Sequence, residues 1–148
     1  MSIFNVVSSK IGHVNLSDGT TILIRAIIAD IVEGEMKPVG PDLQIGLQII
    51  STVKAPEELR KKVQNKPLPP SDKSHLKNME IWEIIKIIRK DDAVEECLYK
   101  ASDGRTYKIS VRIEVTIVAR TLEYRDRGSN PIYHFRWFPC IKVSIAED

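Results

Sequence analysis

Two stretches of the sequence share one pattern: SDGTTILIRAIIADIV at residues 17–32 and SDGRTYKISVRIEVTI at residues 102–117. Each begins with Asp-Gly between apolar runs, which is typical of a hairpin turn because both residues tolerate positive φ. Each continues as an alternating apolar run, which predicts a long β-strand. An offset of 85 residues aligns them, although few identities extend beyond the turn. The shared pattern therefore predicts an internally duplicated β-unit.

The flanking segments predict two repeats of four strands each. The first repeat, about residues 1–54, has expected strands at 3–7, 11–16, 21–32 and 43–53. The second, about residues 79–146, has expected strands at 79–89, 94–99, 106–119 and 132–145. Between residues 76 and 88 a helical stripe also fits the spacing of the apolar residues. Five isoleucines favour the strand, because their branched side chains prefer β structure.

A short helix at 56–63 and a proline-rich connector at 66–71 join the repeats. Residues 1–148 form one domain, because the length suits a single core and neither repeat alone would close a sheet. The fold class is therefore all-β with one short helix. We expect the two antiparallel meanders to form a closed or nearly closed barrel, which removes exposed strand edges. A two-sheet sandwich is the alternative.

Composition sets broad limits on the class of protein. The net charge of +2 is too small to identify a nucleic-acid binder by itself. No apolar run approaches the ~20 residues that span a bilayer, and the first residues do not resemble a signal peptide. We therefore expect a cytoplasmic protein with no membrane contact. Twenty-one isoleucines and only three glutamines resemble the composition of hyperthermophilic archaeal proteins.

Metal, cofactor and catalytic motifs are absent from the sequence. Cys97 and Cys140 lack the spacing and histidine neighbours of a zinc site, and free thiols are favoured over a disulfide. His13, His75 and His134 lie far apart, and each is expected to be an ordinary surface residue. GxSxG, GxGxxG, HExxH and P-loop patterns do not occur. The sequence predicts no cofactor and no metal, and it favours a protein that is not an enzyme.

The second repeat predicts a polar, mostly basic outer face. In 106–119 the odd positions are apolar and the even ones polar, and the last strand continues this parity. A polar hairpin tip at 120–131 adds arginines beside a tyrosine, which could contact phosphates and stack on a base. The candidate partner-binding residues are Arg112, Arg120, Tyr124, Arg125, Arg127, His134 and Arg136. A solvated tip that binds nothing is the simpler interpretation.

The first repeat has an apolar outer face instead. Leu23, Ile27 and Ile31 alternate on the side that the second repeat makes polar. A strand that is apolar on both faces is normally covered on both. Either the 56–63 helix and the connector cover this face, or these three residues form a homodimer interface.

Asp30 is the most unusual polar residue, because the alignment places it on the core side of its strand. A buried carboxylate is costly unless it is paired. Asp30 therefore pairs with an arginine, contributes to a pocket, or lies at a bulge that turns it outward, and the last is favoured.

These observations support three functions. The leading hypothesis is a non-catalytic binding or assembly module that contacts an acidic macromolecule through its basic face. The first alternative is an RNA or single-stranded nucleic-acid binding protein. The second is a small-molecule enzyme or ligand binder with a pocket inside the barrel, which a filled interior would oppose.

Overall fold

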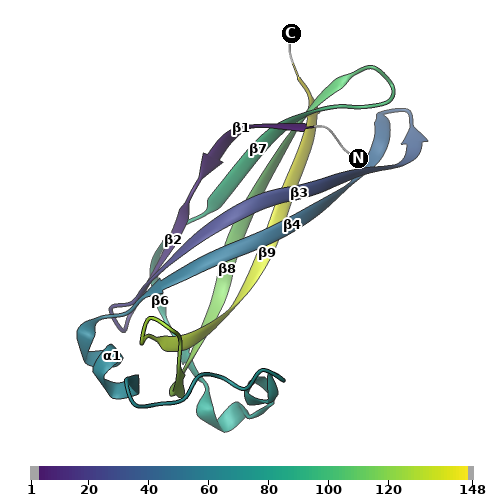
Figure 1. Cartoon of the computed structure of the whole chain (residues 1–148). Helices are drawn as coiled ribbons and strands as arrows, with labels where there is room; N and C mark the ends of the chain where they lie inside the picture. Colours follow the sequence, from purple (N-terminus) through teal and green to yellow (C-terminus); the bar gives the residue numbers. More distant parts are fainter. Residues whose placement is uncertain (1–3, 147–148) are drawn as a thin grey trace.

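The computed structural model describes residues 4–146 of the chain (Figure 1). Its strands are β1 (Phe4–Lys10), β2 (Gly12–Leu16), β3 (Thr21–Lys37), β4 (Gly40–Lys54), β5 (Glu83–Ile85), β6 (Ile87–Asp91), β7 (Ala93–Lys100), β8 (Thr106–Arg125) and β9 (Pro131–Ile145). Its helices are α1 (Glu57–Val63) and the 3₁₀ turns η1 (Ser74–Lys77) and η2 (Met79–Ile81). The all-β class with one short α-helix is therefore confirmed.

The strands form two antiparallel sheets, and the predicted closed barrel is wrong. One sheet has the order β1-β7-β8-β9, with the short β5 pairing the far end of β8, and the other has the order β4-β3-β2-β6. Within the described residues β4 pairs only with β3, and β9 pairs only with β8. Two sheet edges therefore stay open. The arrangement agrees with the sandwich alternative.

The two sheets are linked where strands pass from one to the other. β1 pairs with β7, but the chain bends after Lys10 so that β2 joins the other sheet. In the same way β6 pairs with β2, and the chain bends at Asp92 so that β7 joins the first sheet. The bends meet at Gly12, where a Cβ atom would overlap the backbone of residues 91–93. Glycine is required there because two backbones cross without room for a side chain.

The strand order is the same in both sheets. β2, β3 and β4 are successive neighbours, as are β7, β8 and β9, and each sheet gains one strand from the other half of the chain. The turns before β3 and β8 also correspond, with Gly19 at φ 89° and Gly104 at φ 85°. Positive φ is the conformation that the Asp-Gly pattern predicts. Duplication as the origin of this correspondence stays a prediction.

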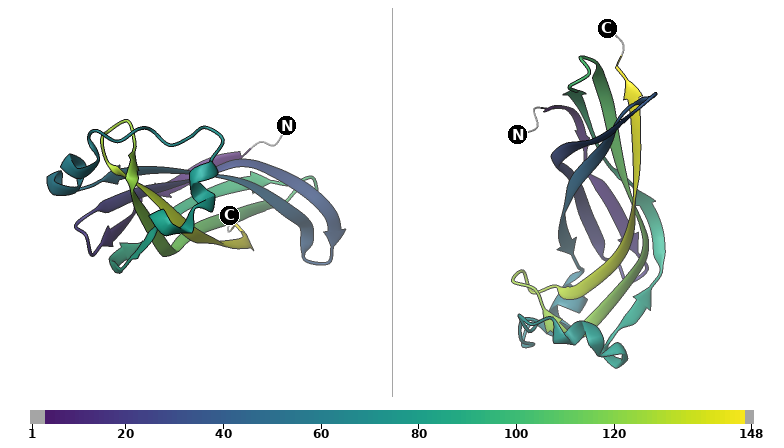
Figure 2. Two further views of the ribbon diagram at one scale, coloured as in Figure 1. Left: turned by 90° about the horizontal axis from the view of Figure 1, so that it is seen from below. Right: turned by 90° about the vertical axis from the view of Figure 1, so that its right-hand side faces the viewer.

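The core lies between the facing sheets. Its buried side chains come mainly from β2 and β3 on one side and from β7 and β8 on the other. Figure 2 shows the two sheets from two further directions. Edge strand β4 contributes half-buried side chains to the same core. The space that a barrel pocket would need is therefore occupied by packed side chains.

Two bulges change which side chains face this core. In β3 the register shifts between Ile28 and Asp30, so Ile31 is buried and not on the outer face as predicted. In β8 it shifts between Val115 and Ile117, so Ile117 is partly exposed and Val118 is buried. Strict alternation fails because the extra residue of a bulge moves each later side chain of the strand to the opposite face of the sheet. Strands of 17 and 20 residues use such bulges to curve around a core.

Several predicted boundaries also differ. β8 continues to Arg125, so the second hairpin tip is residues 126–130 and not 120–131. In the first hairpin β3 continues to Lys37 and β4 begins at Gly40. The prediction of one strand at 79–89 is wrong, because η2 occupies residues 79–81 and the rest is divided into β5, which pairs with β8, and β6, which pairs with β2 in the other sheet. Residue 3 of the predicted first strand lies outside the described residues.

Helix α1 does not cover the outer face of β3. Its buried residues Leu59 and Val63 pack toward β8 and β9 at one end of the molecule. The connector, η1 and η2 gather at the same end as the β8–β9 tip, while the β3–β4 tip lies at the other (Figures 1 and 2). No helix in residues 4–146 has the length and apolar character to cross a membrane.

Candidate functional site

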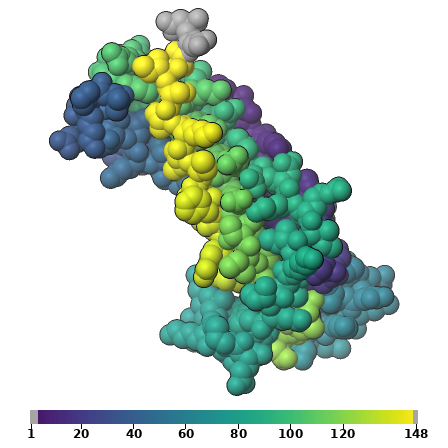
Figure 3. All heavy atoms as spheres, turned by 180° about the vertical axis from the view of Figure 1, so that it is seen from behind, coloured from purple at the N-terminus to yellow at the C-terminus, as the bar shows by residue number. Residues whose placement is uncertain are grey.

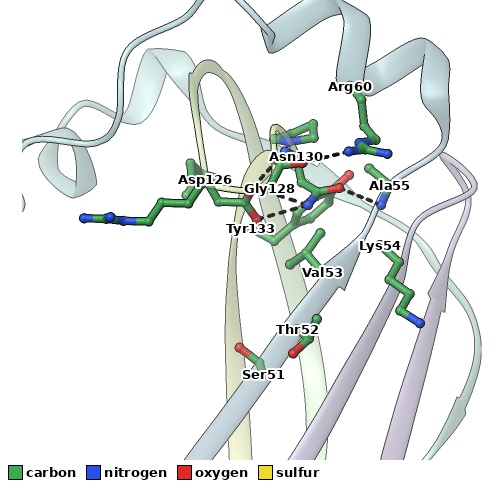
Figure 4. A pocket seen from close by; sticks show the side chains of 13 residues that line it. Ser51, Thr52, Val53, Lys54, Ala55, Arg60, Asp126, Gly128, Asn130 and Tyr133 are labelled. Atoms are coloured by element: carbon green, nitrogen blue, oxygen red, sulfur yellow. Dashed lines mark hydrogen bonds between the residues drawn. The ribbon is translucent and has the colours of Figure 1, made fainter.

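A cleft of about 800 Å³ opens where α1, the end of β4 and the β8–β9 tip meet (Figure 4). It is lined by Ser51, Thr52, Val53, Lys54, Ala55, Arg60, Asp126, Arg127, Gly128, Asn130, Pro131, Ile132 and Tyr133. Three of these side chains are basic and one is acidic, so the lining has a net charge of +2. We call this surface the cationic cleft.

Hydrogen bonds across elements fix the walls of the cationic cleft. The Asn130 side chain accepts from the Ala55 amide at 3.0 Å, which ties the tip to the end of β4. The Asn130 amide donates to Asp126 Oδ1 at 2.8 Å, which closes the tip on itself. The Arg60 Nη2 atom donates to the Gly128 carbonyl at 3.0 Å, which ties α1 to the tip (Figure 4). The cleft is therefore pre-formed by structural contacts.

Two cations of the cleft remain available to a ligand. Lys54 and Arg127 are exposed, and neither has an ion pair with any residue in the range 4–146. Asp126 is occupied by Asn130, which donates to both carboxylate oxygens. The hydroxyls of Ser51 and Thr52 lie along the β4 wall. Such a surface suits an anionic group that accepts hydrogen bonds.

The predicted binding residues do not form one surface. Arg127 lines the cationic cleft, while Arg136 is exposed on β9 outside it. Arg112 lies on the outer face and forms an ion pair with Asp92 at 3.6 Å. The neighbouring cation Lys108 pairs with Glu96 at 3.5 Å. The outer face of β8 is therefore largely neutralised, which weakens it as a site for an acidic partner.

Arg120 lies inside the molecule, because the β8 bulge reverses its direction. Its Nη1 atom lies 3.0 Å from Asp18 Oδ2 and its Nη2 atom 2.9 Å from Glu83 Oε2. The Arg120 and Asp18 side chains are only 11% and 10% exposed. Tyr133 donates to the same Asp18 oxygen at 2.6 Å. Arg120 therefore has a structural role and is no part of a basic face.

Tyr124 and His134 belong to an aromatic cluster with His75 and Trp82, in which His134 is exposed. The His75 ring lies 5.5 Å from the Tyr124 ring and 6.1 Å from the Trp82 ring, and Trp82 also contacts His134 at 6.3 Å. His75 is buried, so the prediction that it is a surface residue is wrong. Tyr124 is half-buried against this cluster and is poorly placed to stack on a base.

Arg125 is tied to the proline-rich connector. Its amide donates to the Pro67 carbonyl at 3.0 Å, and its Nη1 atom donates to the Asp126 carbonyl at 3.2 Å. The bond to Pro67 holds the end of β8, the first strand of the tip, against a residue that is far away in the sequence. Arg125 therefore supports the cleft wall and does not present its charge freely.

Asp30 lies at the β3 bulge and is exposed, in agreement with the favoured interpretation. Its Oδ1 atom accepts from the Ile31 amide at 2.9 Å. It does not line the cationic cleft. The core does contain a buried carboxylate, Glu95, which was not predicted from the sequence. Glu95 is 2% exposed, and it accepts the Ile28 amide at the bulge at 2.5 Å.

The cysteines are free thiols on opposite faces of one sheet. Cys97 is buried, and burial together with the nearby Glu95 raises the pKa of its thiol to about 11. Cys140 is half-buried and lies opposite Arg112. No group of three or more His, Cys, Asp and Glu side chains within residues 4–146 is arranged to hold a metal ion.

Comparison with known proteins gives no relative from which a function could be transferred. No family model, no curated protein and no solved structure matches this chain. The candidate site therefore depends on the geometry of the cationic cleft alone.

Proposed function

We propose that this protein is a non-catalytic binding module that contacts an acidic macromolecule through the cationic cleft. The observation that carries the proposal is the pair of unpaired cations, Lys54 and Arg127, at a pre-formed cleft of about 800 Å³. Fixed cleft walls lower the ordering cost of binding, because loops and side chains need not be immobilised when the ligand arrives. The basic outer face expected from the sequence is less suited, since Asp92 and Glu96 already pair its cations.

Single-stranded nucleic acid is the second candidate, and one observation favours it. The ring of Tyr133 lines the cationic cleft, while its hydroxyl is held by Asp18. A fixed ring beside free cations matches the pairing of base stacking with phosphate contacts in single-strand binding. In this second candidate function Tyr133 takes the stacking role that was predicted for Tyr124.

Charge reversal at the two free cations tests the proposal. Lys54→Glu with Arg127→Glu should weaken binding of both a labelled oligo(dT) and a labelled polyglutamate, because two attractive contacts become repulsive. For the oligonucleotide, each lost phosphate contact should also flatten the log–log salt dependence by about one unit. Fluorescence anisotropy at several salt concentrations measures both effects.

Helix α1 provides the matched control. Lys61→Glu with Lys62→Glu makes the same charge change on exposed residues that do not line the cleft. This control should bind nearly as the wild type does. Loss of binding in both double variants would show that net charge, and not the cationic cleft, controls binding. Absence of wild-type binding to either probe at low salt would end the proposal. Binding of polyglutamate alone would remove nucleic acid as the second candidate.

Two further expectations belong with this proposal. A homodimer interface on the outer face of β3 would now involve Leu23 and Ile27 but not Ile31, which is buried. We also place the protein in the cytoplasm, on the composition of the sequence alone.

A further inference from the structure

Strand β9 has a free edge and an apolar side chain row that its own sheet does not cover. Its only strand partner within residues 4–146 is β8. Four of its side chains lie opposite buried residues of β8 and so face inward, yet they stay exposed by 38% to 58%. They are Trp137, Ile141, Val143 and Ile145. We call these four residues, together with the backbone of β9 on the side that does not pair with β8, the β9 edge. Figure 3 shows β9, in yellow, along the molecular surface.

The β9 edge lies on the open side of the two-sheet structure. On the opposite side the crossing strands β1–β2 and β6–β7 join the sheets. On the open side the other sheet ends at β4, whose inward side chains are half-buried. These side chains are Leu43, Ile45, Leu47 and Ile49. β4 and β9 both line the cationic cleft, and in the described part of the chain neither is hydrogen-bonded to the other. A strand added to β9 would therefore meet apolar side chains from both sheets.

The outward side of β9 determines which charge a complementary strand must carry. Arg136 and Lys142 are exposed and have no ion pair with any described residue. Strand β9 contains no acidic residue at all. Opposite charges on neighbouring strands stabilise a sheet, and like charges destabilise it. A second copy joined through β9 would bring two basic strands together, whereas an acidic strand would complement them.

We propose that the β9 edge binds an extended, acidic segment of a partner protein by strand addition. In that segment apolar residues alternate with Asp or Glu. Its backbone pairs with β9, which gives affinity, and its side chains give specificity. The apolar residues pack beside Ile141 and Val143, while the acidic ones face Arg136 and Lys142. Pro139 lacks a backbone N–H, so the ladder is uninterrupted over residues 140–145 and resumes beyond Pro139 to reach Trp137 and Arg136. This surface is separate from the cationic cleft and acts independently of it.

Two synthetic peptides with blocked ends test the proposal. One alternates valine and glutamate, and the other alternates valine and lysine. Isothermal titration calorimetry at low salt should show binding of the glutamate peptide and binding about tenfold weaker, or none, of the lysine peptide. Trp137 lies at the β9 edge, so its fluorescence should shift to the blue as the added strand excludes water.

Charge reversal on β9 makes the test independent of folding defects. Arg136→Glu with Lys142→Glu should exchange the preference, so that the variant binds the lysine peptide about tenfold better than the glutamate peptide. A variant that gains a new ligand is folded. Arg25→Glu with Arg89→Glu, exposed positions of the other sheet, should leave the preference unchanged.

Five results would overturn this proposal. The first three are absence of binding of the glutamate peptide, equal binding of both peptides by the wild type, and an unchanged preference in the β9 variant. The fourth is a wild-type dimer in sedimentation that Ile141→Glu dissociates, because a second copy would then occupy the edge. The cleft variant Lys54→Glu with Arg127→Glu should bind the glutamate peptide normally. If it does not, which is the fifth result, the peptide binds at the cationic cleft, and the β9 proposal fails while the cleft proposal stands.

Discussion

At the scale of single residues, the two Ser-Asp-Gly turns share a local structure but differ in their surroundings. Asp18 accepts the Thr20 amide and Asp103 the Arg105 amide, each at 2.9 Å. Each carboxylate also accepts a tyrosine hydroxyl at 2.6 Å, from Tyr133 and Tyr107 respectively. The Asp18 carboxylate is nearly buried and is paired with an arginine, whereas the other turn is exposed. The same motif is therefore a structural junction at one end of the molecule and a surface turn at the other.

The environment of Asp18 determines its titration. Burial by itself raises the pKa of this carboxyl, but hydrogen bonds from Tyr133 and Thr20 and the contact with Arg120 outweigh it, so the pKa lies below its usual value. Burial and the bond to Asp18 raise the pKa of the Tyr133 hydroxyl. Because the folded-state pKa of Asp18 is lowered, its contribution to stability is present above the unfolded pKa near 3.8. It is lost as pH falls through the folded value.

Tyr133→Phe tests this junction. The variant should lose about 1.5–3 kcal/mol of unfolding free energy at neutral pH, because a nearly buried carboxylate loses a hydroxyl donor. The loss should shrink as pH falls through the lowered pKa of Asp18, since the bond is then no longer made to a charge. Urea unfolding at neutral and acidic pH measures both quantities. Tyr107→Phe is the matched control and should have a smaller effect, and an equal effect would contradict a special role for Asp18.

At the scale of elements, the two bulges decide which residues of the long strands are buried. At the bulge in β3 the Ile28 amide donates to the Glu95 carboxylate of β7. A buried carboxylate is costly unless it is hydrogen-bonded, and here it satisfies a buried backbone donor. The bulge in β8 turns Arg120 toward Asp18. Bulge and buried polar residue therefore occur together in both strands.

Two substitutions test whether β3 contains the bulge or alternates strictly along its length. Ile31 is 1% exposed and Ala29 is exposed, although strict alternation would place both on the outer face. Ile31→Lys should lower the unfolding free energy by about 3 kcal/mol or more, because it buries an amine in an apolar site. Ala29→Lys should stay within about 0.5 kcal/mol of the wild type. Similar urea-unfolding curves for the two variants would show that the bulge is absent.

At the scale of the whole molecule, the halves of the chain depend on each other. Each sheet contains strands from both halves, since β1 pairs with β7 and β6 pairs with β2. The common core also draws on both sheets. The cationic cleft follows from the same interlocking, because β4 and α1 meet the β8–β9 tip only when both sheets are assembled. Stability and the candidate site therefore belong to the whole fold.

Interlocked halves predict one cooperative unfolding transition. Trp82 and Trp137 both lie in the second half, so tryptophan fluorescence reports that half, while far-ultraviolet circular dichroism reports both sheets. The two signals should give coincident urea curves, since neither half retains its partner strands when the other unfolds. Separate midpoints would show that the halves unfold independently, against this arrangement.

The sequence by itself determined the local features of this protein. Strand positions, the Asp-Gly turns and the short helix were predicted because side-chain periodicity and turn conformation depend on neighbouring residues. The tertiary structure alone decided the exchange of β1 and β6 between sheets, the open edges and the bulge in β8, whereas Asp30 on the core side of its strand had indicated the bulge in β3. These tertiary features depend on how long strands curve around a shared core, so the inward turn of Arg120 had no local signal. The cationic cleft was equally hidden, because Lys54, Arg60 and Arg127 are distant in sequence and meet only through the packing of α1 and the β8–β9 tip.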